Sequence, residues 1–298
     1  MSFDSFIMVD WSARSVPSPV KPVKDAIFIG QDDQRPIYCR TRRAAMDHLH
    51  QVLDQTVAQG KRVLLGFDFA FGYPQGFAER LTGKPSALAV WDWLADHITD
   101  GPQNENNRFQ IAAQVNAMYD GDGPLWGCPP SIQIDGLSPT KGILDVRLAD
   151  KRLAEQHMPS AQPVWKLFTT GSVGSQTLLG LPHLQRLRRR YGNDLRVWPM
   201  ESGWEKPDAL ITLVEIYPSM LRQDGPLGGQ DFGWASKDEI YQIEDAVQVR
   251  GMARGFATLQ DKGALDGLFQ PASSERVAVE EGWIMGLMPK AKAESRAA

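Results

Sequence analysis

The run "VLLGF", residues 63–67, constrains the fold most, because an almost entirely apolar segment is followed at once by an ionisable residue, Asp68. A short apolar run of this kind is typical of a central strand covered on both faces. A lone carboxylate removed from water costs several kcal/mol or keeps its proton, so Asp68 needs a partner. That partner is a backbone cap, an arginine or a metal ion.

Three shorter apolar runs precede this strand. Residues 6–9 predict a first strand, which is followed directly by Asp10. Residues 26–30 and 36–40 predict a hairpin around the polar turn "QDDQR". A Pro-rich loop joins the first strand to the hairpin.

Apolar residues recur at helical spacing over residues 42–59, with Thr41 as N-cap and Gly60 as C-terminal stop. A helix placed between the hairpin and the 63–67 strand makes a crossover, which gives a mixed sheet. Asp10 and Asp68 are then expected on adjacent parallel strands at the carboxyl edge, where ligands bind in open α/β sheets.

The rest of the chain reads as helices and two more strands around turn-rich segments. We expect one α/β domain over residues 1–290, in which residues 75–170 form a mainly helical insertion, and a flexible tail at 291–298. The helices are predicted at residues 86–98, 107–119, 145–157, 176–191 and 236–259, and the strands in "LRVWPMES" and "ALITLVEIYPS".

Charge and cysteine content exclude several classes of protein. A formal charge of −4 over 298 residues argues against a protein that coats nucleic acid nonspecifically. No apolar run is long enough to span a membrane, and the first residues lack the pattern of a secretory signal. Two distant cysteines, Cys39 and Cys128, favour neither a disulfide framework nor a structural zinc site, so we expect a cytoplasmic protein.

Four carboxylates share a common setting and are the candidate catalytic residues. Asp10, Asp68 and Glu215 end strand-like runs, and Asp245 lies on the amphipathic helix expected to cover the sheet. Carboxylates that converge repel one another, and a divalent cation removes this repulsion. The pattern therefore predicts Mg²⁺ or Mn²⁺ held by Asp10, Asp68 and Asp245.

Each of these residues also has a structural interpretation. Asp10 and Asp68 are suited to capping a turn or a helix, and Glu215 to the exposed side of an edge strand. Asp245 has acidic neighbours, Glu244 and Asp238, which is also the pattern of a solvated helix face. Which of these three faces the site stays open at this point.

The segment 169–180, "TTGSVGSQTLLG", is a second candidate binding site. Backbone N–H groups of a Gly/Ser-rich loop that enters a helix are able to hold a phosphate. The candidate residues of this loop and its upstream lysine are Lys166, Gly171, Ser172, Gly174 and Ser175. The alternative is a simple loop with Ser175 as the helix N-cap. The basic run at 184–192 reads as a solvated helix face, with Leu184 and Leu187 pointing inward.

Five segments, taken in order, resemble a known bacterial family. "IMVDWSA", "LLGFDFAFGYP", "LVEIYPS", "EDAVQVRGMARGF" and "EEGWIMG" are similar to a family of unknown function classed among predicted nucleases of the ribonuclease H-like superfamily. They lie between Ile7 and Gly286. The resemblance implies a ribonuclease H-like sheet, mixed and of at least five strands, flanked by helices. It also implies that Asp10, Asp68 and Asp245 are the acidic residues of the site, and that Glu215 lies in the family's E-x-Y-P strand.

The resemblance and the residues together predict a divalent-metal-dependent nuclease or phosphodiesterase, in which water activated by the metal attacks a phosphodiester. Its substrate would be a nucleic acid or a nucleotide. Two alternatives remain at this stage. One is a non-catalytic nucleotide-binding module with a cleft like that of actin-like ATPases, and the other is an accessory protein in molybdopterin dinucleotide metabolism. Protein partners are not predicted.

Overall fold

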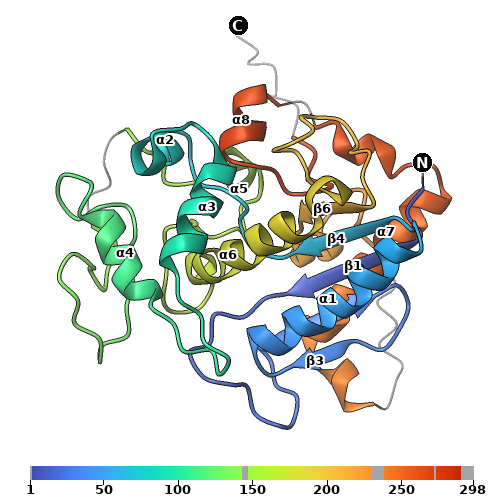
Figure 1. Ribbon diagram of the computed structural model, residues 1–298, viewed down its shortest axis with the longest axis horizontal. Coiled ribbons are helices and arrows are strands. Elements are labelled where there is room, and N and C mark those ends of the chain that lie inside the picture. Colours follow the sequence, from blue (N-terminus) through green and yellow to red (C-terminus); the bar gives the residue numbers. More distant parts are fainter. Residues whose placement is uncertain (1, 143–146, 230–237, 272, 290–298) are drawn as a thin grey trace, which may run out of the picture.

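The computed structural model describes residues 2–142, 147–229, 238–271 and 273–289. Within these ranges the chain forms one mixed six-stranded sheet with helices on both faces (Figure 1). The strand order is β3-β2-β1-β4-β6-β5. The strands are β1 (Ser5–Asp10), β2 (Ile27–Gln31), β3 (Ile37–Cys39), β4 (Val63–Phe67), β5 (Leu195–Val197) and β6 (Ile211–Glu215).

The two halves of the sheet differ in direction. β1, β2 and β3 are antiparallel neighbours, whereas β1, β4, β6 and β5 run parallel. Helix α1 (Arg42–Ala58) makes the crossover between β3 and β4. Its N-cap is Thr41, whose hydroxyl oxygen accepts from the backbone N–H of Ala44 at 3.1 Å. The predicted hairpin, crossover helix and N-cap are confirmed.

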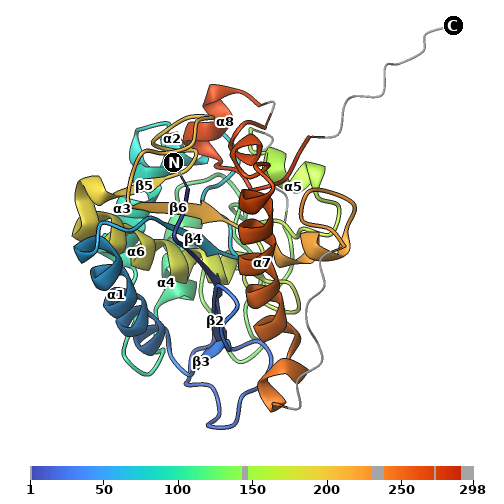
Figure 2. The ribbon, with the colours of Figure 1, turned by 90° about the vertical axis from the view of Figure 1, so that its right-hand side faces the viewer.

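Helices cover the two faces of the sheet from opposite sides. Figure 2 shows α1 and α6 (Val173–Tyr191) on one side of the strands and α7 (Glu244–Asp261) on the other. Side chains of β1 alternate accordingly, because successive residues of a strand point to opposite faces. Ile7 and Val9 lie in the apolar cluster with α1 and α6, and Phe6 and Met8 lie in the cluster with α7.

Gly30 of β2 allows α7 to lie directly on the sheet. A Cβ at this position would come within 2.6 Å of the backbone carbon of Val249 in α7. Any side chain there would push the helix away, so the close approach needs glycine. The first turn of α7 is thereby held near the carboxyl end of β1.

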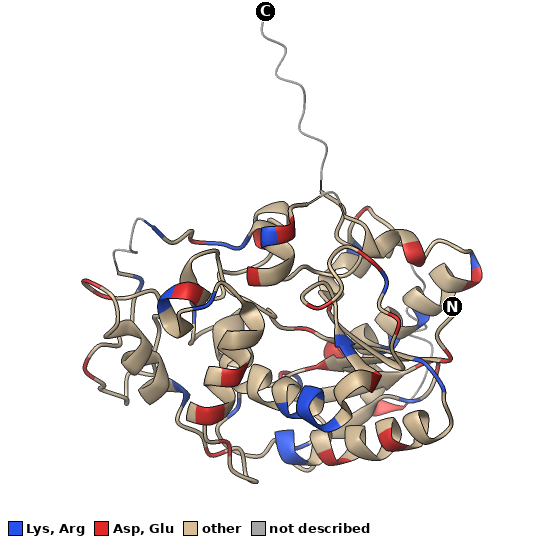
Figure 3. Cartoon of the chain, turned by 45° about the horizontal axis from the view of Figure 1, so that its top comes forward, with Lys and Arg blue, Asp and Glu red and all other residues tan. Residues whose placement is uncertain are grey.

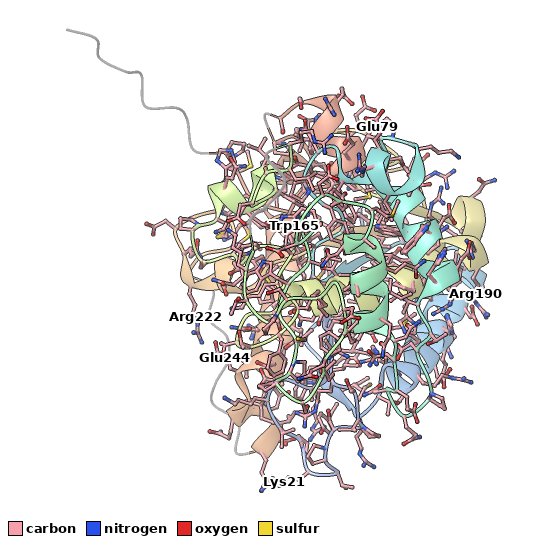
Figure 4. The ribbon with its side chains drawn as sticks, turned by 90° about the vertical axis from the view of Figure 1, so that its left-hand side faces the viewer. Lys21, Glu79, Trp165, Arg190, Arg222 and Glu244 are labelled. Atoms are coloured by element: carbon pink, nitrogen blue, oxygen red, sulfur yellow. The ribbon has the colours of Figure 1, made fainter. Side chains whose placement is uncertain are left out.

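The insertion belongs to the same core as the sheet. Trp165 is fully buried against Tyr73 and Phe77, within the cluster that also holds Val9 and Phe67 (Figure 4). The described helices of the insertion are short and separated by long turns, so the expectation of a mainly helical segment fits only its first part. They are α2 (Phe77–Thr82), α3 (Ala87–His97), α4 (Arg108–Asn116) and α5 (Leu153–His157).

The helices predicted at 86–98 and 107–119 are confirmed as α3 and α4. The helix predicted at 145–157 is too long, because only α5, Leu153–His157, is helical among its described residues. Residues 145 and 146 lie outside the described residues. The apolar spacing that suggested a longer helix comes instead from Leu148, which is buried from within a turn.

Two helix starts also differ from the prediction. Helix α6 begins at Val173, three residues early, with Ser172 as its N-cap, so the assignment of Ser175 as N-cap is wrong. Helix α7 begins at Glu244 rather than 236, because Asp238 caps a separate 3₁₀ turn, Glu239–Gln242. Residues 236 and 237 lie outside the described part of the chain. The last α-helix is α8 (Glu275–Glu280).

The basic run of α6 is a solvated face, as predicted. Leu184 and Leu187 are buried, and the arginines that follow pair with acidic residues of other elements. These pairs are Arg188–Glu201, Arg189–Asp92 and Arg190–Asp54. Basic and acidic residues accordingly lie close to one another along the visible helices (Figure 3). Among the described residues no helix is long and apolar enough to cross a membrane.

Candidate active site at the carboxyl edge of the sheet

Asp10 and Asp68 meet at the carboxyl edge because of the register between their strands. Val9 of β1 is opposite Phe67 of β4, so the aspartates that follow them are also neighbours. Side chains two residues apart on a strand point to the same face of the sheet. Asp10 therefore points to the same face as Phe6 and Met8, and Asp68 to the same face as Leu64. This is the face that α7 covers. The prediction that both carboxyl groups lie at one edge on adjacent parallel strands is confirmed.

The partners of Asp68 are a backbone group and the other aspartate. Its Oδ1 accepts the Trp11 N–H at 2.8 Å, and its carboxyl group is hydrogen-bonded to that of Asp10. No arginine or lysine of the described residues forms an ion pair with Asp10 or Asp68. The negative charge at this edge is therefore not neutralised by a basic side chain of this part of the protein.

The electrostatic setting disfavours two negative charges in this place. Burial raises the pKa of Asp10 well above its ordinary value, and the nearby carboxylates of Asp68 and Asp245 raise it further. Burial also raises the pKa of Asp68 to about 7, although the Trp11 N–H and the hydrogen bond with Asp10 act in the opposite direction. In the protein alone, both carboxyl groups therefore favour the protonated form more than a free aspartate does.

Asp245 is the third carboxylate at this edge and lies in the first turn of α7. Its Oδ2 accepts the backbone N–H of Asp25 at 2.7 Å, and its charge acts on both Asp10 and Asp68. Burial raises the pKa of Asp245 as well. Asp10, Asp68 and Asp245, which the sequence analysis named on two strands and one helix, thus all lie at this edge of the sheet.

The acidic neighbours of Asp245 face elsewhere. Glu244 pairs with Arg222 at 2.8 Å on the outside of the molecule, where both are labelled in Figure 4. Asp238 pairs with Arg35 at 2.5 Å. The alternative of a solvated helix face therefore holds for Glu244, whereas Asp245 turns towards the sheet.

The structure does not bring Glu215 to this cluster. Glu215 is opposite Phe67 rather than Asp68, so its side chain leaves the sheet on the opposite face. Both of its carboxylate oxygens accept hydrogen bonds from Arg152, at 2.6 and 2.8 Å, and Oε2 also accepts the Phe71 N–H at 2.9 Å. Glu215 is thus neutralised within the core.

Arg152 is the residue of this edge that the sequence did not reveal. It is 1% exposed, and besides Glu215 it binds Glu155 at 2.8 Å and the backbone oxygen of Glu281 at 2.9 Å. The pocket beside Asp68 is lined by Arg152, Glu215 and Val173 among others. Arg152 therefore joins α5, β6 and the segment after α8 directly behind the acidic cluster.

Three backbone N–H groups of the Gly/Ser-rich loop are already engaged within the chain. The backbone N–H groups of Gly174 and Ser175 donate to the carbonyls of Lys166 and Ser172, and that of Val173 donates to Gly171. The Lys166 ammonium group donates to the Thr170 carbonyl at 2.7 Å. The N–H groups of Gly174 and Ser175 and the ammonium group of Lys166 are thus engaged, and the phosphate-binding role of Lys166, Gly171, Ser172, Gly174 and Ser175 stays a prediction.

The donor set at the edge fits a hard divalent cation that is only partly held by protein. Mg²⁺ is commonly bound by one or two carboxylates, with water and substrate oxygens completing its shell. Asp10 and Asp68 offer such a pair, and no set of three or more acidic, His or Cys side chains in the described ranges is close enough to enclose a metal ion. No family model, curated protein or solved structure matches the chain.

The raised pKa values predict how stability depends on pH without metal. Between about 4 and about 7 the folded protein keeps protons on the pair that the unfolded chain has lost, so the free energy of unfolding should fall as pH rises through this window. Urea unfolding in EDTA at the two ends of the window measures this. Asp68→Asn should flatten the dependence, and an equal slope in parent and variant would contradict the assignment.

Proposed function

We propose that this protein is a divalent-metal-dependent phosphodiesterase or nuclease built on a ribonuclease H-like core. The observation that supports it most is the pair Asp10 and Asp68, which lie half-buried side by side without a basic partner among the described residues. Buried charges are normally paired or bind metal, and strongly perturbed groups cluster at functional sites.

The architecture is consistent with this proposal. Three antiparallel strands lead through a helical crossover to a parallel β4, and the acidic residues come from the first strand, the end of the fourth strand and the helix over them. This is the placement that the family resemblance implies. Fold alone does not fix an activity, so the proposal depends on the carboxyl groups and their surroundings.

Each residue of the cluster has a distinct role in the proposal. Asp10 and Asp68 hold the metal, and the Trp11 N–H fixes the direction of the Asp68 carboxylate. Asp245, anchored by the Asp25 N–H, adds negative charge beside them and accepts hydrogen bonds from water in the cleft. When bound, Mg²⁺ or Mn²⁺ polarises a phosphoryl oxygen and makes water a stronger nucleophile at neutral pH. Glu215 holds Arg152 and does not bind metal.

The metal-dependent hydrolase is favoured over the nucleotide-binding alternative centred on residues 169–180, since the N–H groups of Val173, Gly174 and Ser175 in that loop are engaged within the chain.

A direct assay tests the proposed activity. The protein should hydrolyse bis(p-nitrophenyl) phosphate or short oligonucleotides with Mn²⁺ or Mg²⁺, and EDTA should stop the reaction. Asp245→Asn should lower kcat/KM by about ten- to a hundredfold, as expected for a group that supports metal ligands. Asp238→Asn, an acidic residue near the same helix that faces Arg35, serves as the matched control and should retain activity. Absence of turnover with either metal would contradict the proposal.

A further inference from the structure

Arg108 of α4 is a buried cation that has no acidic partner among the described residues. It is 7% exposed, and its guanidinium stacks on the ring of Phe109 with 4.2 Å between Cζ and the ring centroid. Its hydrogen bonds go to neutral groups: Nε donates to Ser175 Oγ at 2.9 Å, and Nη1 donates to Ser15 Oγ at 2.9 Å and Asn106 Oδ1 at 2.6 Å. Nη2 makes no hydrogen bond with the described part of the chain.

The nearest acidic group is already neutralised by other residues. Asp100 binds Arg42 through both oxygens, at 2.6 Å each, and its Oδ2 also contacts His183 at 2.8 Å. Burial, with a further contribution from the charge of Arg42, lowers the pKa of Arg108 to about 10. This region therefore carries an excess of positive charge inside the protein, which is costly unless an anion from outside compensates it.

Arg108 is linked by hydrogen bonds to two segments that adjoin the proposed active site. Ser15 belongs to the loop that leaves Asp10, and Ser175 to the first turn of α6, whose Val173 lines the pocket next to Asp68. Gln176 of the same turn donates to the Trp11 carbonyl at 2.5 Å, which ties α6 to the residue after Asp10. Ser15 is exposed, so solvent reaches the guanidinium from this loop.

The loop itself carries a second arginine without a carboxylate partner. Arg14 precedes Ser15, makes no ion pair with a described residue, and has a buried Nε without a hydrogen-bond acceptor. Its backbone is fixed by Arg42, which donates to the Arg14 carbonyl at 2.8 Å. The loop that leaves the acidic pair is thus positively charged and held in place.

We propose that Arg108, together with the Ser15 hydroxyl group, binds a phosphate group of the substrate other than the one that is cleaved. The Nη2 atom of Arg108 has no acceptor among the described residues, and its N–H groups carry the positive charge that makes hydrogen bonds to phosphate oxygens strong. The inference rests on the proposed function and narrows its substrate class to molecules with at least two phosphate groups, such as an oligonucleotide, rather than a simple monophosphate diester.

The test measures anion binding without metal or turnover. Inorganic phosphate is titrated into the full-length protein in EDTA at low ionic strength, and calorimetry and the rise in Tm report binding. Arg108→Gln should weaken phosphate binding about tenfold or more, because hydrogen bonds to a charged group are lost. Arg108→Lys keeps the charge without the fork and should bind with intermediate affinity.

Two controls separate this inference from the proposed activity. Arg188→Gln removes an arginine at the other end of α6, which pairs with Glu201, and should bind phosphate like the parent. Asp10→Asn should also retain phosphate binding, even if it abolishes hydrolysis. The inference is overturned if the metal-free parent does not bind phosphate, or if Arg108→Lys and Arg108→Gln both bind it as tightly as the parent.

Discussion

Asp10→Asn is expected to abolish metal-dependent hydrolysis and to make the metal-free protein more resistant to unfolding. Activity should fall by about a thousandfold or more, because Asp10 is one of the two proposed metal ligands. The rise in stability follows from the raised pKa of Asp10: the fold disfavours its charge, and asparagine supplies a neutral group of the same shape. The two effects have opposite signs, which a generally damaging substitution would not produce.

The measurements are kcat/KM with Mn²⁺ and Tm in EDTA above neutral pH, where the parent carries most charge at this edge. Asp47→Asn is the matched control, since Asp47 is exposed and pairs only with Arg43 one turn earlier in α1. Its Tm and activity should stay close to those of the parent. Full activity of Asp10→Asn, or a large loss of stability, would contradict a role for Asp10 in metal binding.

Arg152→Met should cause the largest loss of stability in the chain. Removing one partner from a buried ion pair costs about 3–5 kcal/mol, because the remaining charge is left without compensation. Here Glu215 and Glu155 would both lose their cation inside the core, and the Glu281 carbonyl would lose a donor. Urea unfolding measures the effect as a lower midpoint.

Arg188→Met is the control for this substitution, because Arg188 pairs with Glu201 at a partly exposed site. It should lower the free energy of unfolding by only about 0–1 kcal/mol. Adding Glu215→Gln to Arg152→Met should restore part of the lost stability, since it removes one of the orphaned charges. A loss for Arg152→Met no greater than that of the control would show that Arg152 does not hold this edge together.

The sheet was predictable because its strands carry local signals. The apolar run of β4, the run of β1 and the helical spacing of α1 each depend on neighbouring residues, and the crossover rule then sets their order. Helix boundaries were less predictable where a cap depended on tertiary contacts. The start of α7 moved to Glu244 because Asp238 caps a separate turn and pairs with Arg35 from a distant loop.

The acidic site was predictable only in part. Asp10 and Asp68 follow paired strands, so their meeting could be inferred from strand order alone. The face on which Glu215 leaves β6 depends on its register with β4, which the sequence does not show. Arg152 gave no signal because two of its partners, Glu215 and Glu281, lie 63 and 129 residues away, and long-range pairing is invisible in a local pattern.

The Gly/Ser-rich loop shows the limit of composition as a signal. Its glycines suggested open N–H groups, yet Gly174 is there because a Cβ would come within 2.2 Å of the Val164 carbonyl oxygen. The glycine allows close packing rather than ligand binding. Arg108, the cation without an acidic partner in the part of the chain that the structure describes, comes instead from α4, where a single arginine between Asn107 and Phe109 carried no signal of its burial.

The measurement that tests the central proposal most directly is anomalous diffraction from crystals soaked in Mn²⁺. We expect a peak between the carboxyl groups of Asp10 and Asp68, in contact with both, and its loss in crystals of Asp10→Asn. Density that shows the two carboxyl groups still bonded to each other at saturating Mn²⁺, with no peak between them, would contradict the proposal.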